Sequence, residues 1–355
     1  MGTYEAGQSY PRKGVRPNSL PDREPNQNLG CTGLPLGYSK VDSLYVGGSF
    51  MDKVRILVTG GSGFVGQVLL PRLETRDYEI INLDLVIGKF KSKSLVNELY
   101  CDIREFNEVD NAFKEFKPHK VVHLAALTDV RESIQNPMQD LETNAVGTLN
   151  VVKSCNKYKV SKVVYLNSGG AIYGDQTDFP ISEISPVKPI SPYGASKFFG
   201  ENIISTIGEM DWTSLRLSNV YGGLDSKGVI NIFLRNFIHE RPCYVFGDGS
   251  TTRDYIHVRD VVDAILKSME SDLLGIFNVS SSIETSLKDV YQVIKKISGK
   301  EVPIEFTPAI AGEISRSALS NCKLQEFGWS PKVSLSAGIE KLYYELLNTE
   351  ASEVF

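Results

Sequence analysis

Short apolar runs alternate with amphipathic segments over most of the chain. The apolar runs at 56–58, 80–83, 121–126 and 163–166 are typical of buried parallel strands. Between them, the segments 64–73, 105–116 and 140–158 have helical periodicity. In the last segment, Leu141, Val146, Leu149, Val152 and Cys155 are expected to share one apolar face. Strands that alternate with helices predict an α/β fold around a doubly wound parallel sheet.

A glycine-rich turn joins the first predicted strand to the first predicted helix. Gly60, Gly63 and Gly66 have the spacing G-x-x-G-x-x-G. Backbone without Cβ atoms can bring several N–H groups and a helix N-terminus close to a pyrophosphate. The strand–turn–helix context favours a Rossmann-like dinucleotide site over a simple tight turn, with Phe64 and Val65 in the first helical turn against the cofactor.

Asp84 ends the next apolar run, 18 residues after Gly66. A carboxylate there can accept hydrogen bonds from both ribose hydroxyls and would repel a 2′-phosphate, so the sequence predicts NAD rather than NADP. Asp102 and Ile103 follow the next short apolar segment. Asp102 could bind the adenine amino group, or it could cap the helix at 105–116; the two roles are compatible.

Small residues end the apolar run at 121–126. Leu124, Ala125 and Ala126 are expected to form a wall against the nicotinamide or its ribose. The later run at 163–166 leads into the polar segment 167–170. Because ligands of such sheets bind at the carboxyl ends of the strands, these segments are expected to border one site.

A proline-rich connection, 180–192, leads to Tyr193 and Lys197 at the start of a helix predicted to reach Ile207. Residues four apart share one helical face. A phenol with a pKa near 10 is a poor base at neutral pH. We expect the Lys197 ammonium and a nicotinamide cation to lower the pKa of Tyr193, which would make it a catalytic base.

The bulk composition is ordinary for a globular enzyme: 355 residues, 41% hydrophobic and 23% charged, with a net charge of −5. It gives no sign of a nucleic-acid surface, and no apolar run is long enough for a membrane helix. The five cysteines are scattered, without metal-ligand spacing or a disulfide framework, so no metal site is expected and a cytoplasmic location is the default.

The chain is expected to divide into three parts. Residues 1–50 are rich in Pro, Gly, Ser and Asn and predict a disordered leader or tag. Residues 51–218 form the expected NAD-binding domain. Residues 219–355 form most of a smaller α/β substrate-binding lobe, which interleaves with the first domain and contains helices at 287–297 and 337–347.

Five motifs together resemble a known family. They are T-G-G-S-G-F-V-G (59–66), H-L-A-A (123–126), S-P-Y-G-A-S-K (191–197), L-R-L-S-N-V-Y-G (215–222) and G-D-G-S-T-T-R-D-Y-I-H-V-R-D (247–260). From about residue 53 to its end, the chain resembles the extended short-chain dehydrogenase/reductases. Within these it is most similar to the NAD-dependent nucleotide-sugar epimerases and dehydratases of the UDP-glucose 4-epimerase type.

The resemblance implies roles for individual residues. Tyr193 would be the catalytic base, and Lys197 would bind the nicotinamide ribose. Asn219 and Arg253 would contact the nucleotide diphosphate, although Asn219 could be a turn residue and Arg253 could pair with Asp254 or Asp260. Two more positions match family contacts. Thr128 would touch the nicotinamide ribose or cap a helix, and Tyr173 would wall the sugar pocket or pack in the core.

Three departures from the family pattern are visible. Gly169 stands where the family has a catalytic Ser or Thr, and Ser168 is the expected replacement. Ile310 stands where many epimerases have a second pyrophosphate arginine, a role that Arg316 would take beside Glu313. Ser317 stands where a bulky residue restricts some epimerases, so N-acetylated sugars are expected to fit.

The resemblance implies reversible C4 epimerisation of a UDP-hexose through a 4-keto intermediate by a homodimer. A 4,6-dehydratase or a decarboxylase is less favoured, because Gly170 and Ala171 replace the acidic pair that elimination requires. A non-catalytic NAD-binding protein is the alternative from another functional class.

Overall fold

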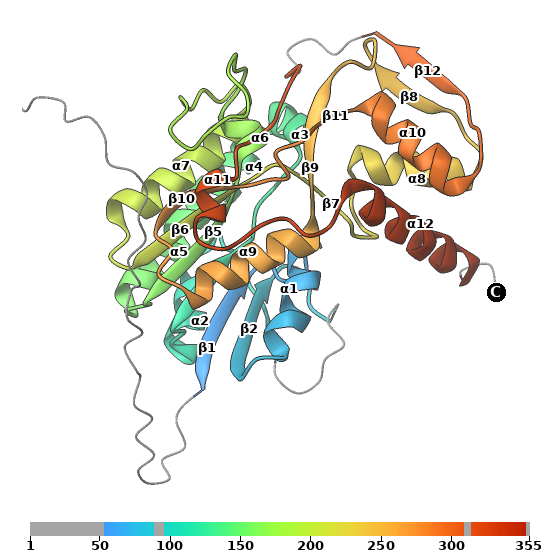
Figure 1. Ribbon diagram of the computed structural model, residues 1–355. Helices are drawn as coiled ribbons and strands as arrows, with labels where there is room; N and C mark the ends of the chain where they lie inside the picture. The colour runs from blue at the N-terminus through green and yellow to red at the C-terminus, as the bar shows by residue number, and fades with distance from the viewer. Residues whose placement is uncertain (1–52, 89–95, 309–313, 353–355) are drawn as a thin grey trace, which may run out of the picture. The chain divides into compact units, whose positions relative to one another are not determined.

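Seven parallel strands form the central sheet, in the order β10-β6-β5-β4-β1-β2-β3 (Figure 1). The strands are β1 (Val54–Thr59), β2 (Tyr78–Asp84), β3 (Val96–Tyr100), β4 (Lys120–His123), β5 (Lys162–Ser168), β6 (Asp211–Leu217) and β10 (Gly275–Val279). The computed structural model describes residues 53–88, 96–308 and 314–352, so the predicted leader lies outside the described residues. The strand order reverses between β1 and β4, where ligands of doubly wound sheets bind. The predicted fold class is confirmed.

Helices cover both faces of this sheet because successive strand side chains point to opposite sides. Ile56 and Val58 face α1 (Phe64–Glu74) and α9 (Val258–Glu270), whereas Leu57 faces the opposite helical layer. That opposite layer consists of α2 (Phe106–Phe116), α5 (Gly147–Lys157) and α7 (Pro192–Ile207).

The predicted helix at 140–158 is continuous but not uniform. It consists of α4 (Pro137–Leu141), the π-helical turn η1 (Glu142–Val146) and α5, and it follows the short helix α3 (Val130–Gln135). On the predicted apolar face, Val152 and Cys155 are buried, whereas Leu141 and Val146 are 42% and 41% exposed. The inner part of this face therefore packs in the core, and Leu141 and Val146 lie at the surface.

The strand predicted at 121–126 ends earlier, at His123. Hydrogen bonds to Thr59 account for the end of the strand at this position. Its carbonyl oxygen accepts the N–H of Leu124, and its hydroxyl accepts the N–H of Ala125. The backbone of 124–126 therefore turns over the end of β1 and borders the glycine-rich turn.

Two small sheets and three helices make most of the second lobe (Figure 1). The sheets are β11-β9-β7 and β12-β8, with β7 (Asn219–Tyr221), β8 (Cys243–Phe246), β9 (Thr252–His257), β11 (Glu284–Ser286) and β12 (Ile304–Thr307). The helices are α8 (Val229–Ile238), α10 (Leu287–Ser298) and α12 (Leu335–Ser352), with the short α6 (Gly169–Ile172) and α11 (Cys322–Gln325) elsewhere. The predictions of helices at 287–297 and 337–347 are confirmed.

The second half of the chain contributes to the main sheet as well as to the small lobe. β10 pairs with β6, and α9 covers the same face as α1. Residues 51–355 accordingly form one compact unit. Within the described ranges, no helix is long and apolar enough to span a membrane.

A buried ion pair joins α7 to the sheet. Glu201 accepts from Arg216 of β6 at 2.5 and 3.1 Å, and both side chains are less than 5% exposed. Asn167 and Ser214 also donate to Glu201, at 2.8 and 2.6 Å. The carboxylate is therefore fully surrounded by donors, as burial of a charge requires.

Removal of this carboxylate should destabilise the protein strongly. We expect Glu201→Gln to lower the free energy of unfolding by about 3–5 kcal/mol, because it leaves the Arg216 guanidinium buried without its counter-charge. Urea unfolding measures the change. The matched control is Lys157→Ala, which breaks the solvent-exposed pair with Asp110 and should leave the unfolding midpoint near the wild-type value. Equal midpoints for the two variants would contradict the assignment.

Candidate active site

The glycine-rich turn is shaped by close approaches of the backbone. Gly60 has φ +73°, and a Cβ atom there would lie 2.6 Å from the backbone nitrogen of Ala125. A Cβ atom on Gly66 would lie 2.2 Å from the carbonyl oxygen of Gly61, where α1 packs on the turn. Gly63 is the N-cap of α1, and the first turn of that helix holds Phe64 and Val65. The turn thus presents a helix N-terminus at the carboxyl end of β1, as predicted.

Asp84 lies beside this turn, at the end of β2. Its carboxylate accepts the N–H of Ser62 at 2.9 Å and that of Val86 at 3.0 Å. A carboxylate has about four acceptor sites, so capacity remains for ribose hydroxyls. The sequence analysis missed buried Asn82, which accepts the N–H of Gly61 and donates to the Ser62 hydroxyl. An amide inside an apolar strand was the signal for this support.

Asp102 is held by Arg104. The guanidinium and backbone N–H of Arg104 donate to its carboxylate at 2.5–3.0 Å, and this hydrogen bonding lowers the pKa of Asp102. The helix-capping alternative is wrong, because Glu105 is the N-cap of α2. Ile103 is buried, and its carbonyl oxygen accepts from Asn150. The adenine contacts of Asp102 and Ile103 remain predictions.

The segment after β4 also lies at the carboxyl ends of the strands, next to the glycine-rich turn. Leu124, Ala125 and Ala126 are partly buried, and the Ala125 backbone packs against Gly60. Thr128 is exposed, and it does not cap a helix, because Asp129 caps α3 by accepting the N–H groups of its first turn.

Tyr193, Ser168 and Lys197 come together at the carboxyl ends of β4 and β5. Tyr193 is 8% exposed, and the neighbouring Ser168 side chain acts to lower the pKa of its phenol. Lys197 is 3% exposed, and its Nζ lies 4.2 Å from the ring centroid of Tyr165. Next to Lys197, His123 is enclosed by the hydroxyls of Thr59 and Thr148, at 2.6 and 3.0 Å. These positions match the predicted arrangement of a tyrosine and a lysine on one helical face.

Burial is the largest influence on the pKa values of Tyr193, Lys197 and His123. It raises the pKa of Tyr193 to about 12, an effect that Ser168 opposes and the charge of Asp140 reinforces. It lowers the pKa of Lys197 to about 7 and that of His123 to about 3. The expectation of a lowered pKa for Tyr193 is therefore wrong for the protein by itself, because desolvation of the phenolate is the largest influence on this pKa.

The structure gives a reason for Gly169 at the family's Ser or Thr position. A Cβ atom on Gly169 would lie 2.5 Å from Cδ1 of Leu319 and 3.3 Å from the carbonyl oxygen of Leu217. A side chain at 169 would therefore clash with the core. Ser168, at the end of β5, carries the hydroxyl that reaches Tyr193 instead.

The predicted substrate residues converge near Gly170. An ideal Cβ atom on Gly170 would lie 3.8 Å from Oδ1 of Asn219 and 4.0 Å from Oγ of Ser317. Asn219 pairs with Tyr255 between β7 and β9, and Arg253 lies two residues earlier on β9. Arg253 and Tyr255 therefore share one face of that strand.

Arg316 lies further out. It donates two hydrogen bonds to Glu284, at 2.6 and 3.0 Å, and its guanidinium lies 4.3 Å from the ring centroid of Phe179. Glu313 lies outside the described residues. Tyr173 is 1% exposed, and its hydroxyl bonds Arg216 and Asn278, so the packing alternative is correct.

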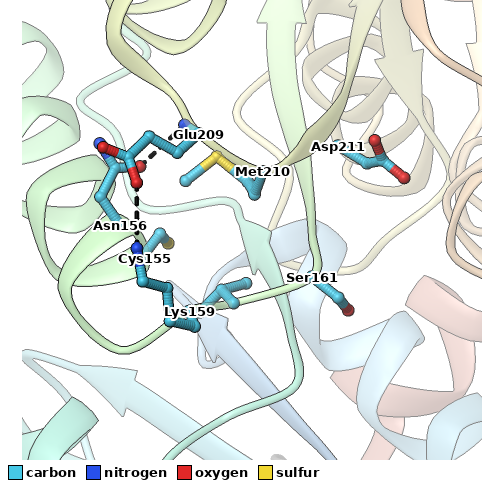
Figure 2. A pocket seen from close by; sticks show the side chains of 8 residues that line it. Cys155, Asn156, Lys159, Ser161, Glu209, Met210 and Asp211 are labelled. Atoms are coloured by element: carbon cyan, nitrogen blue, oxygen red, sulfur yellow. Dashed lines mark hydrogen bonds and ion pairs between the residues drawn. The ribbon is translucent and has the colours of Figure 1, made fainter.

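A separate hollow lies on the other side of the sheet from Tyr193, at the amino ends of the strands (Figure 2). Its lining includes Asn156, Lys159, Glu209 and Asp211, close to the amino ends of β5 and β6. Glu209 pairs there with Lys159 at 3.1 Å. The hollow is thus remote from the strand ends where Tyr193 lies. In the part of the chain that the structure describes, no group of three or more His, Cys, Asp or Glu side chains could hold a metal ion.

Comparison with known proteins decides the family. Residues 56–280 match the model of the NAD dependent epimerase/dehydratase family. The chain belongs to this family. The matched range includes the glycine-rich turn, Asp84, Ser168, Tyr193 and Lys197. The cofactor of this family is NAD.

Individual family members resemble the chain over most of its length. It is 36% identical over 304 residues to a UDP-glucose 4-epimerase of Mycolicibacterium smegmatis, covering 81% of this chain and 97% of that protein. The UDP-glucose 4-epimerase of Thermus thermophilus, solved with NAD, is 33% identical with a TM-score of 0.77, covering 83% and 99%. The enzyme of Thermotoga maritima, solved with UDP-glucose, is 32% identical with the same TM-score, covering 84% and 99%.

The glycine-rich turn can be tested by one methyl group. We expect Gly60→Ala to lower NAD affinity at least tenfold, because the positive φ adds about 1–3 kcal/mol of strain and the methyl group meets the Ala125 backbone. NAD released from the purified protein by denaturation measures the loss. The control is Gly88→Ala, with a similar φ of +79° but no atom of the described residues within 4 Å of its Cβ, which should keep its NAD. Wild-type NAD content in Gly60→Ala would refute this role.

Proposed function

We propose that this chain catalyses the reversible, NAD-dependent epimerisation of a UDP-hexose at C4. The observation that carries the proposal is the grouping of Tyr193, Ser168 and Lys197 beside the glycine-rich turn. The identity to UDP-glucose 4-epimerases, over more than four-fifths of the chain, supports the same reaction.

The residues around the turn fit NAD. Gly60 and Gly63 leave the backbone open to a pyrophosphate, and Asp84 keeps acceptor sites for the adenosine ribose. Leu124, Ala125, Ala126 and the exposed Thr128 would flank the nicotinamide ribose. Bound by these residues, NAD would supply a hydride acceptor and donor for C4 of the sugar.

Tyr193 would hold and move the proton of the reaction. Its phenol oxygen takes the proton of the 4-hydroxyl group and returns it after the sugar has turned over. The Ser168 hydroxyl, which acts on the pKa of this phenol, would orient the reacting hydroxyl. A pKa of about 12 means that proton removal requires positive charge near the phenolate, which Lys197 and the nicotinamide cation would supply together. Burial of both side chains excludes water from this transfer.

Residues of the second lobe would bind the nucleotide sugar. Asn219 and Arg253 are proposed to contact the diphosphate, with Arg316 and Glu313 nearby. Arg316 would have to leave Glu284 to do so. Gly170 lies next to Asn219 and Ser317, and it offers no carboxylate for water elimination, which favours epimerisation over a 4,6-dehydratase reaction.

The proposed assembly is a homodimer. Five apolar side chains on α3, α4, η1 and α7 are 41–63% exposed: Ile134, Met138, Leu141, Val146 and Phe199. α4 and α7 contact each other, so these residues offer an apolar surface that a second copy would cover. Residues 51–218 would hold NAD, and most of 219–355 would hold the sugar nucleotide. The free thiols of Cys101, Cys155, Cys243 and Cys322 support a reducing, cytoplasmic environment.

A turnover assay tests the reaction. Purified protein incubated with UDP-glucose and no added NAD should give UDP-galactose, detected by NMR. Tyr193→Phe should lower kcat by about 10²–10⁴-fold, because it removes the base but keeps the ring. A 4-keto-6-deoxy product would favour a dehydratase. NAD binding without any product would favour the non-catalytic alternative.

The size of residue 317 tests the sugar class. We expect the wild-type protein to epimerise UDP-N-acetylglucosamine, because Ser317 leaves room beside Gly170 and Asn219. Ser317→Tyr should lower kcat/KM for UDP-N-acetylglucosamine by at least about tenfold more than for UDP-glucose, because a steric clash costs about 1–3 kcal/mol. Ser317→Thr serves as the control. A wild-type protein that turns over UDP-glucose but not the acetylated sugar would refute this prediction.

A further inference from the structure

Asp140 is a buried carboxylate that the mechanism above does not use. It lies on α4 and is 1% exposed. A buried carboxylate is costly unless donors or a cation compensate its charge. The groups that contact Asp140 therefore indicate its role.

Two side chains donate hydrogen bonds to Asp140. The Ser196 hydroxyl lies 2.5 Å from Oδ1, and Nδ2 of Asn144 lies 3.1 Å from Oδ2. Ser196 stands one residue before Lys197, and its oxygen lies 3.0 Å from the Tyr193 carbonyl oxygen. Asn144 is bonded in turn to both backbone groups of Leu127, beyond the end of β4. Asp140 thus connects α4 to the turn of α7 that carries Tyr193.

The charged and titratable groups around Lys197 come from four elements. Glu201 lies one turn along α7, His123 on β4, Tyr165 on β5 and Asp140 on α4. The Glu201 carboxylate is already paired with Arg216. His123 is neutral at physiological pH, and Tyr165 contributes the face of its ring. Asp140 is hydrogen-bonded only by neutral groups among the described residues, and Lys197 is the cation acting on it.

We propose that Asp140 is a positioning residue that acts through Lys197. Its negative charge keeps the Lys197 ammonium protonated in a site that would otherwise favour the neutral amine. Its bond to Ser196 holds the first turn of α7 against α4. The inference rests on the proposed function, because it assigns Lys197 a charged role during proton transfer by Tyr193.

The direction of the pKa shifts agrees with this role. Burial lowers the pKa of Lys197 to about 7, and the charge of Asp140 is the largest opposing effect. The ammonium loses its proton as the pH rises through this value. Burial also raises the pKa of Asp140, and the hydrogen bonds from Ser196 and Asn144 and the charge of Lys197 oppose this rise. Without the charge of Asp140, the pKa of Lys197 is expected to fall further, so the ammonium would lose its proton at a lower pH.

Asp140→Asn removes the charge and keeps the shape. An asparagine amide can accept from Asn144 and donate to the Ser196 oxygen, so both contacts survive. Ser196→Ala is the matched control, because it removes the hydrogen bond and keeps the carboxylate. The direct readout is NMR of protein labelled with ¹³C at lysine Cε, in which the Lys197 signal is the one missing from Lys197→Arg.

We expect the Lys197 signal to titrate near pH 7 in the wild-type protein and about one unit lower in Asp140→Asn. In Ser196→Ala the midpoint should stay near the wild-type value. If Asp140→Asn fails to fold, Asp140→Ser, which still offers Asn144 an acceptor, carries the same expectation. An unchanged midpoint after loss of the carboxylate, or an equal shift in Ser196→Ala, would overturn the proposal, as would a wild-type Lys197 that titrates near its ordinary, unperturbed value.

The pH profile of turnover supplies the functional readout. The alkaline limb of kcat/KM should move about one unit lower in Asp140→Asn, which is a tenfold loss on that limb. The KM for UDP-glucose should change less than kcat. Because the NMR titration needs no turnover, a wild-type protein without epimerase activity would refute the proposed function, while the midpoint shift would still decide the role of Asp140.

Discussion

The buried pairing of Glu201 with Arg216 holds the catalytic helix on the sheet. Tyr193, Lys197 and Glu201 follow one another at intervals of four residues, so they lie along a single buried face of α7. Glu201 fixes the far end of this face by accepting from Arg216, Asn167 and Ser214, which belong to two neighbouring strands. The near end is fixed by Ser196 against α4. Tyr193 therefore lies on a helix that side-chain hydrogen bonds connect to β5, β6 and α4.

Such burial has opposite effects on the two catalytic side chains. Desolvation disfavours both charged forms, so it raises the pKa of the phenol and lowers that of the amine. A phenolate beside an ammonium is thus unfavourable in the resting protein. Positive charge from a bound nicotinamide would favour the phenolate, whereas the charge of Asp140 favours the ammonium of Lys197 and disfavours the phenolate of Tyr193. The dependence on the bound nicotinamide would restrict proton removal to the fully assembled complex.

Much of the fold follows from local patterns in the sequence. The apolar runs and the glycine spacing predicted the parallel sheet, the position of Asp84 and the helix that carries Tyr193 and Lys197, because each depends on neighbours in the chain. The ends of strands and the exposure of single residues were harder to predict. Thr59 binds the backbone after His123, and Leu141 and Val146 of the predicted apolar face lie exposed at the surface. Both effects arise from contacts or geometry that no periodicity encodes.

The candidate site could be predicted only in part, for a related reason. Tyr193 and Lys197 are four residues apart, but Asp140 reaches the site across more than 50 residues, and Asn82 reaches it from inside an apolar strand. The side-chain volume at Gly169 depends on Leu319, which is 150 residues away in the sequence. Burial also reversed the expected pKa shift of Tyr193, and burial cannot be read from residue order.

The return of the chain from the small lobe to the main sheet limits how this protein can fold. β10 completes the sheet beside β6, and α9 covers the face that α1 leaves open. A gene fragment ending after β6 would encode a sheet with a bare apolar edge and an uncovered face. The NAD-binding sheet and the second lobe are therefore expected to depend on each other for folding, because the chain must pass through the lobe before it completes the sheet.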